Sequence, residues 1–154
     1  MAEQRVRIAR DKSEFVKRLA DSENSDSSIF NTYVDLLAFA ASLGYKQGRK
    51  SPIEGAAKDP SPIRQDVFET SYSHLINLLA VVETKDPGIL SNTEEAQKRR
   101  VIIFEEFANG GLEILEEKLR GSVDHLGTLA LVVGSGASDS GAERTSFDLD
   151  TLIR

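Results

Sequence analysis

The side chains best placed to do chemistry are five cations in the first third of the chain. Arg5 and Arg7 are two residues apart, so both lie on one face of an extended strand. Lys46, Arg49 and Lys50 form a compact basic turn directly after an apolar segment. Lysine and arginine neutralise DNA phosphates, and arginine also pairs with guanine in the major groove. These five residues are therefore the candidate DNA-binding set.

A group of glutamates in the last third offers a second kind of chemistry. Paired carboxylates can bind a hard cation or act as general acid and base. Their spacing also suits the solvated face of an amphipathic helix, which we take as the principal interpretation. A carboxylate-bound metal enzyme therefore stays an alternative, with no metal and no cofactor as the main expectation. The glutamates are Glu105, Glu106, Glu113, Glu116 and Glu117.

Other catalytic patterns are missing from the sequence. The two histidines, His74 and His125, fall in separate predicted helices and are read as structural or surface residues. There is no Ser-x-x-Lys, Gly-x-Ser-x-Gly or Walker-type motif. Cysteine is absent, which excludes disulfides, thiol nucleophiles and cysteine-ligated metal sites. We expect a protein that is not an enzyme.

Charge and hydropathy bound the classes of partner. The 154 residues carry a net charge of −6. The first 58 residues hold 10 Lys and Arg against 8 Asp and Glu, whereas the rest hold 9 against 17. An acidic chain is a poor non-specific DNA binder, so DNA contact would have to use the basic first third. No apolar run approaches the ~18–20 residues that span a bilayer, and no secretory signal begins the chain, so a cytoplasmic protein without membrane contact is expected.

The elements that must position the five cations can be read from periodicity. Residues 4–10 alternate as a half-buried strand does, with Val6 and Ile8 on the face opposite the arginines. A first helix follows over about 13–19, and residues 22–28 form a polar loop. A second helix begins near Asn31 or Thr32 and stops at Gly44. Its small residues, Ala38, Ala40 and Ala41, allow a neighbouring helix to approach closely.

The second half predicts further helices. A third begins at Pro62 or Ile63, and a fourth runs through Ile103 to Phe107. Because adjacent glycines cost about 1 kcal/mol each in a helix, a kink or break is expected at residues 109–111. A last apolar helix covers 122–133. The prediction is a mainly α, single helical domain of five to six helices over 1–133, with a short N-terminal strand, followed by a flexible Ser/Gly-rich tail over 134–154.

Three segments together resemble a known family. They are residues 7–19 (RIARDKSEFVKRL), residues 30–49 (FNTYVDLLAFAASLGYKQGR) with Pro52, and residues 103–115 (IFEEFANGGLEIL). On these segments the chain resembles the DNA phosphorothioation-associated protein 4 family, which accompanies Dnd-type DNA sulfur-modification systems, over residues 5–133. Such systems replace a non-bridging phosphate oxygen of DNA with sulfur, and a partner module restricts unmodified DNA.

The resemblance implies an accessory role, because a chain without cysteine cannot carry sulfur or a cysteine-ligated cluster. The expected function is a non-enzymatic component of this defence system that bridges protein subunits and contacts DNA through its basic face. Its expected partners are other proteins of the system, and DNA. The alternative is a ribbon-helix-helix-like homodimeric regulator, in which paired strands from two chains carry Arg5 and Arg7 into the major groove.

Overall fold

The structure is a computed structural model that describes residues 4–20 and 30–120. The chain divides into two units, residues 1–116 and 117–154, and the account below concerns the first. The predicted helix over 122–133, the domain boundary at 133 and the predicted tail over 134–154 all lie outside the described residues.

The described residues are mainly helical, as predicted, with one short two-stranded sheet. The expectation of five to six helices was too high, because these residues hold four α-helices. None of these helices is long and apolar enough to cross a lipid bilayer. The elements are β1 (Arg5–Val6), α1 (Ser13–Ala20), α2 (Tyr33–Gln47), β2 (Ile63–Arg64), α3 (Gln65–Thr84) and α4 (Glu94–Leu119), with 3-10 turns at Arg10–Lys12 and Pro87–Leu90.

The alternating N-terminal segment is extended, and its apolar face is buried as predicted. Val6 and Ile8 are fully buried, whereas Arg5 and Arg7 lie at the surface. β1 pairs antiparallel with β2 of the same chain, with Arg5 opposite Arg64. Beyond β1, the amide of Ala57 donates to the Ile8 carbonyl, and the amide of Arg10 donates to the Gly55 carbonyl. The N-terminal segment is therefore attached along one edge to residues 55–65.

Helix α2 begins where the sequence predicts and ends later. The side chain of Thr32 caps it by accepting a hydrogen bond from the amide of Asp35 at 3.0 Å. The predicted stop at Gly44 was wrong, because the helix continues to Gln47. Its cap is Gly48, which has a φ of 68° that glycine adopts without strain. Gly44 lies buried in the middle of the helix instead.

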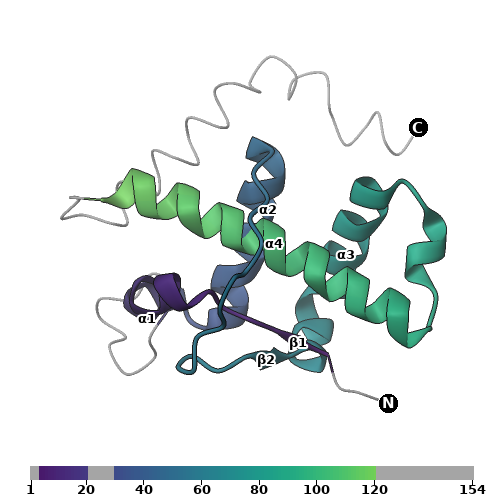
Figure 1. The fold of residues 1–154 in the computed structure, drawn as a ribbon, viewed down its shortest axis with the longest axis horizontal. Coiled ribbons are helices and arrows are strands. Elements are labelled where there is room, and N and C mark those ends of the chain that lie inside the picture. Colours follow the sequence, from purple (N-terminus) through teal and green to yellow (C-terminus); the bar gives the residue numbers. More distant parts are fainter. Residues whose placement is uncertain (1–3, 21–29, 121–154) are drawn as a thin grey trace. The chain divides into compact units, whose positions relative to one another are not determined.

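Gly44 is buried because α2 and α4 cross at very short range (Figure 1). A Cβ atom on Gly44 would lie 2.2 Å from the carbonyl oxygen of Phe107, and one on Gly111 only 1.7 Å from that of Ala40. The predicted kink or break at residues 109–111 was therefore wrong, and α4 is continuous from Glu94 to Leu119. Glycine allows the two helix backbones to lie close together there. The small residues of α2 had already predicted that a neighbouring helix would approach closely.

Helix α3 contains the kink that α4 lacks. It follows β2 and begins at Gln65, two to three residues later than predicted. At Tyr72 the backbone leaves the helical region, with φ −129° and ψ 16°. The hydroxyl of Tyr72 donates a hydrogen bond of 2.6 Å to the carboxylate of Asp35 in the first turn of α2. A hydrogen bond therefore connects the bend in α3 to the first turn of α2.

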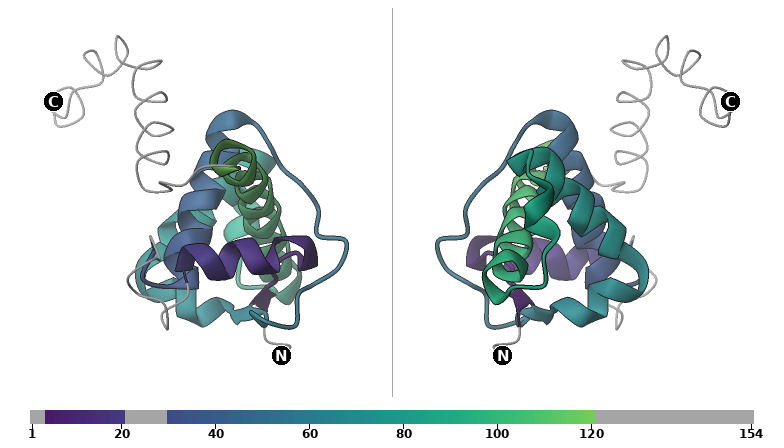
Figure 2. Two further views of the ribbon diagram at one scale, coloured as in Figure 1. Left: turned by 90° about the vertical axis from the view of Figure 1, so that its left-hand side faces the viewer. Right: turned by 90° about the vertical axis from the view of Figure 1, so that its right-hand side faces the viewer.

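Helix α4 crosses α2 and packs against α3. Figure 2 views it nearly along its axis, with α2 and α3 on one side and the segment of residues 49–62 on the other. Phe104 of α4 is fully buried and meets Phe68 of α3 edge to face, with ring centroids 5.3 Å apart. This buried ring contact therefore helps to fix the position of α3 relative to α4.

Candidate functional site

Arg7, one of the five predicted cations, forms an ion pair with Glu105 of the same chain. Its Nη2 donates to Oε1 of Glu105 at 2.6 Å, and its Nε donates to Oε2 at 3.0 Å. The backbone amide of Arg7 also donates to Oε2, at 2.8 Å. The Glu105 side chain is 2% exposed and that of Arg7 is 44% exposed. These hydrogen bonds raise the pKa of Arg7 against the opposing effect of its burial.

Arg5 lies two residues before Arg7, on β1, and is exposed. The strand register places Arg64 of β2 directly opposite it, and Arg64 in turn forms an ion pair with Asp66. Sequence reasoning did not select Arg64. The pairing of two strands more than fifty residues apart leaves no local signal in the sequence.

The other three cations lie at the end of α2 and just beyond it. Lys46 is exposed in the last turn of the helix. The amide of Arg49 donates to the carbonyl of Gly44 at 2.8 Å, which closes the helix end. Lys50 forms an ion pair with Glu83 of α3, and its ammonium lies 5.8 Å from the ring centroid of Phe107. The five cations therefore lie on two segments, residues 5–7 and residues 46–50, and at least two of them already have an acidic partner.

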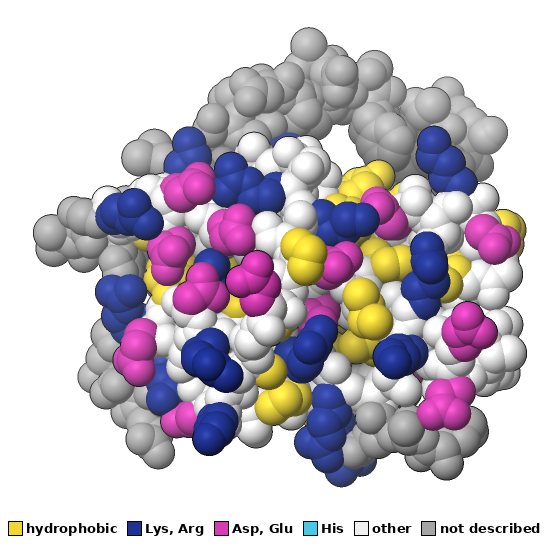
Figure 3. All heavy atoms as spheres, in the orientation of Figure 1, with side chains coloured by type: hydrophobic (Ala, Val, Ile, Leu, Met, Phe, Trp, Pro, Cys, Tyr) yellow, Lys and Arg dark blue, Asp and Glu magenta, His cyan; other side chains and the backbone are white. Residues whose placement is uncertain are grey.

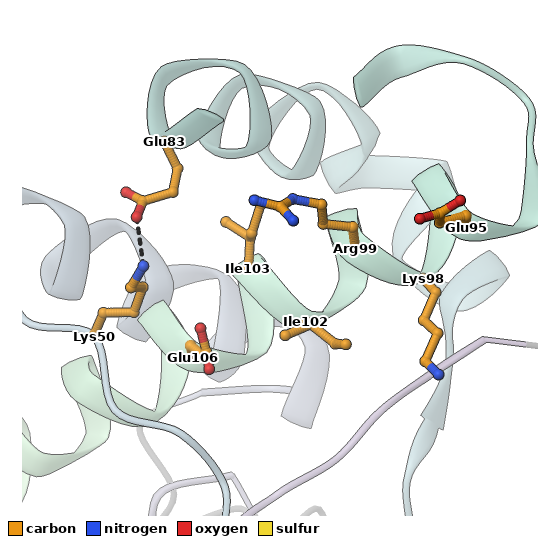
Figure 4. A pocket seen from close by; sticks show the side chains of 8 residues that line it. All are labelled: Lys50, Glu83, Glu95, Lys98, Arg99, Ile102, Ile103 and Glu106. Atoms are coloured by element: carbon orange, nitrogen blue, oxygen red, sulfur yellow. Dashed lines mark hydrogen bonds and ion pairs between the residues drawn. The ribbon is translucent and has the colours of Figure 1, made fainter. Parts of the chain in front are cut away.

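Lys50 also stands at one end of a groove between α3 and α4, which we call the α3–α4 groove (Figure 4). The groove has a volume of about 420 Å³. In Figure 4, Lys50 and Glu83 point toward each other, Arg99 points toward Ile103, and Lys98 points away from Arg99. The lining residues are Lys50, Glu83, Glu95, Lys98, Arg99, Ile102, Ile103 and Glu106.

Charges of both signs surround the apolar part of this groove. Three lining residues are basic and three are acidic, and between them lie the half-buried Ile102 and the buried Ile103. Figure 3 shows the same interspersion of positive and negative side chains over this face of the molecule, with apolar side chains among them. A phosphate-binding surface would need one dominant sign, so this face does not have the character of a DNA-binding patch.

The predicted glutamate cluster is dispersed in the structure. Glu105 is bound by Arg7, Glu106 lines the α3–α4 groove, and Glu113 lines a different cavity. Over residues 4–20 and 30–120, no group of three or more metal-ligating side chains comes together. These three glutamates therefore lie in three different environments. The geometry gives the metal-enzyme alternative no support.

The ribbon-helix-helix alternative requires β1 to pair with the same strand of a second chain. Here one edge of β1 is occupied by β2. On its other side, the amide of Arg7 donates to Glu105 rather than remaining available to a ribbon partner. The order of strand, helix and helix is present, but the strand pairing that defines the class is made within this chain.

Comparisons with known proteins bear on the family. A family model described as DNA sulphur modification system-associated protein 4 matches residues 5–152, which includes β1, all four described helices and most of the remaining chain. No curated protein and no solved structure matches the chain. The match confirms the resemblance carried by residues 7–19, 30–49 and 103–115. The chain belongs to the family of DNA sulphur modification system-associated protein 4.

Proposed function

We propose that this protein is a non-enzymatic accessory component of a DNA sulphur modification system and that it bridges other proteins of that system. Membership of the family supports the association with the system. The observation that carries the bridging role is the α3–α4 groove, where three basic and three acidic side chains surround Ile102 and Ile103. We take its occupant to be a segment of a partner protein.

The chemistry of the groove favours a protein over a nucleic acid. Interface cores are apolar and exclude water, and their rims carry polar groups of both signs that fix register. A partner segment that inserts an apolar side chain above Ile102 and presents both acids and bases would complement the lining residues. A DNA backbone would meet Glu83, Glu95 and Glu106 as repulsive charges.

The test is co-expression of the full chain with the other proteins of its modification system, followed by co-purification. We expect Ile102→Glu to lower the recovered partner by at least about tenfold, because it places a charge in the apolar part of the groove. The matched control is Val67→Glu on α3, since Val67 is exposed and does not line the groove. Circular dichroism checks that both variants keep the helical fold. Unchanged recovery with Ile102→Glu would remove the groove from the proposal.

DNA contact through Arg5, Arg7, Lys46, Arg49 and Lys50 is the second part of the proposal. Arg7 and Lys50 would have to exchange Glu105 and Glu83 for phosphate, so they would contribute less than an uncommitted cation. Lys46 is exposed, so its substitution gives the clearest test of DNA contact. If it contacts a phosphate, Lys46→Gln should reduce the slope of log affinity against log salt by about 1. DNA binding that is absent at low salt, with and without the partner proteins, would refute this part.

A further inference from the structure

We propose that the partner segment bound in the α3–α4 groove carries an aspartate or glutamate, and that Arg99 of α4 binds its carboxylate. This inference rests on the proposed bridging function and names the chemistry by which the groove would select its occupant. It depends on where Arg99 lies, on what its side chain contacts, and on the charges around it.

Arg99 lies where the α3–α4 groove adjoins a second cavity. This cavity, called here the turn cavity, has a volume of about 350 Å³. The end of α3, the 3-10 turn at Pro87–Leu90 and the start of α4 line it. The groove and the turn cavity share Glu95 and Arg99 among their lining residues. A segment that extends from one cavity into the other would therefore pass the guanidinium of Arg99.

The side chain of Arg99 has no partner of its own. Arg99 is exposed, and neither a hydrogen bond nor an ion pair reaches its side chain from any residue that the structure describes. A glutamate four residues before an arginine on one helix favours an ion pair, but Glu95 and Arg99 do not form one. In Figure 4 the Arg99 side chain points toward Ile103 and away from Glu95. Its guanidinium is therefore available beside the apolar part of the groove, whereas Lys50 at the other end is paired with Glu83.

A carboxylate is the group that this arrangement fits best. A guanidinium presents parallel N–H donors that match the two oxygens of a carboxylate or a phosphate. The neighbouring charges decide between the two. A DNA strand would bring a row of phosphates past Asp86 and Glu95 in the turn cavity and Glu83 in the groove, all of which repel it. A single acidic side chain needs only Arg99, and the apolar residues beside it in the partner segment would contact Ile102.

The first experiment uses Arg99→Lys in the full chain, co-expressed and co-purified with the other proteins of its modification system. This variant keeps the positive charge and supplies an amine, which a carbodiimide joins directly to a carboxylate in ion-pair contact. We expect an amide bond between position 99 and an aspartate or glutamate of one of those proteins, mapped by mass spectrometry. Glu69→Lys places an amine at an exposed site of α3 outside both cavities and should give no such bond.

The second experiment reverses the charge. Arg99→Glu should lower the recovered partner by at least about tenfold, because two carboxylates would then face each other. The matched control is Lys58→Glu, which makes the same change in net charge at an exposed residue outside both cavities. Its recovery should equal that of the wild type. Unchanged recovery with Arg99→Glu would overturn the inference.

Three further results would also overturn it. They are no bond from position 99 to a partner protein, equal bonds from positions 69 and 99, and a dependence on Arg99 that nuclease treatment abolishes. The first of these, in a complex that still depends on Ile102, would refute the role of Arg99 while leaving the proposed bridging function intact. A chain that co-purifies with none of these proteins would refute both.

Discussion

At the scale of single residues, the side chain of Arg7 is bound by the carboxylate of Glu105, which lies 98 positions away in the chain. Glu105 lies inside the protein, and all three hydrogen bonds found for it come from Arg7. A buried carboxylate without a partner is costly, so Arg7 neutralises Glu105 before it can serve any external ligand. Arg7, which the sequence suggested as a DNA-binding residue, therefore contributes to the stability of the fold.

The first prediction concerns this pair. Arg7→Ala should lower the free energy of unfolding by about 2–3 kcal/mol, because it leaves the Glu105 carboxylate buried without a cation and with only the backbone amide of residue 7 as a donor. The value lies below that of a fully buried pair because the Arg7 side chain is 44% exposed. Urea denaturation at neutral pH measures it. The double variant Arg7→Met with Glu105→Leu should recover most of the loss, and an equal loss in both variants would show that packing rather than charge is responsible.

A second prediction concerns Tyr72, whose hydroxyl donates to Asp35. This hydrogen bond raises the pKa of Tyr72 above its ordinary value of 10.0, and burial adds to the effect. Tyr72 therefore holds its proton more tightly in the folded state, so its contribution is present below pH ~10 and is lost as pH rises through the raised pKa. Tyr72→Phe should destabilise the protein by about 1 kcal/mol at pH 7.

The pH profile separates this explanation from a simple loss of packing. Unfolding free energies measured from pH 7 to pH 11 should converge for wild type and Tyr72→Phe at the alkaline end. Tyr45→Phe is the control, because Tyr45 is exposed and packs its ring against Phe107. A constant difference between wild type and Tyr72→Phe across this range would count against the hydrogen bond.

What the sequence could predict at this scale was the local part. Alternation placed Val6 and Ile8 in the core and the arginines outside, and both assignments are confirmed. The partners of those arginines, Glu105 on α4 and Arg64 on β2, were missed. Periodicity describes which face of one element is buried, whereas a partner is determined by how distant elements pack, which no local spacing encodes.

At the scale of elements, the crossing of α2 and α4 shows how glycine can be misinterpreted. Helix propensity treats Gly110 and Gly111 as a weak point, and a break was predicted there. In the structure Gly111 lets α4 approach α2 and lies against the backbone of Ala40, whereas Gly110 lies against the backbone of Arg49 and Lys50 just beyond that helix. The penalty in propensity is accepted because packing two backbones closely buries the apolar faces of both helices.

The third prediction follows from this contact. Gly111→Ala should destabilise the protein by at least about 2 kcal/mol, although alanine is the better helix former by about 1 kcal/mol. The reason is that its Cβ would lie 1.7 Å from the Ala40 carbonyl oxygen, so the backbones must separate. Thermal or urea unfolding gives the value.

Gly48→Ala provides the comparison. No atom lies within 4 Å of a Cβ built there, so only its positive φ of 68° opposes the substitution. Its cost should be about 1 kcal/mol. A Gly111→Ala protein as stable as wild type would mean that the two helices do not cross at this distance.

At the scale of the whole molecule, the net charge of −6 and the interspersed charges on the face in Figure 3 both argue against strong non-specific DNA binding. Composition had already indicated that non-specific DNA binding would be weak, and the acidic partners of Arg7 and Lys50 reduce the available basic charge further. The family was recognised from the sequence and is confirmed over residues 5–152. The α3–α4 groove could not be predicted, because it is lined by segments that meet only after folding.

The last prediction uses salt to separate protein bridging from assembly through DNA. Binding that released counterions from five phosphates would weaken about 500-fold between 50 and 200 mM salt, whereas contacts through a groove with balanced charge should weaken less than about threefold. The dissociation constant of the purified complex, measured at both salt concentrations with and without nuclease treatment, distinguishes the two. Because the groove lining holds three acids and three bases, its long-range attractions and repulsions cancel, and its apolar contact through Ile102 is not screened by ions. A complex that falls apart on nuclease treatment, or that follows the steep salt dependence, would mean that DNA and not this groove holds the partners together.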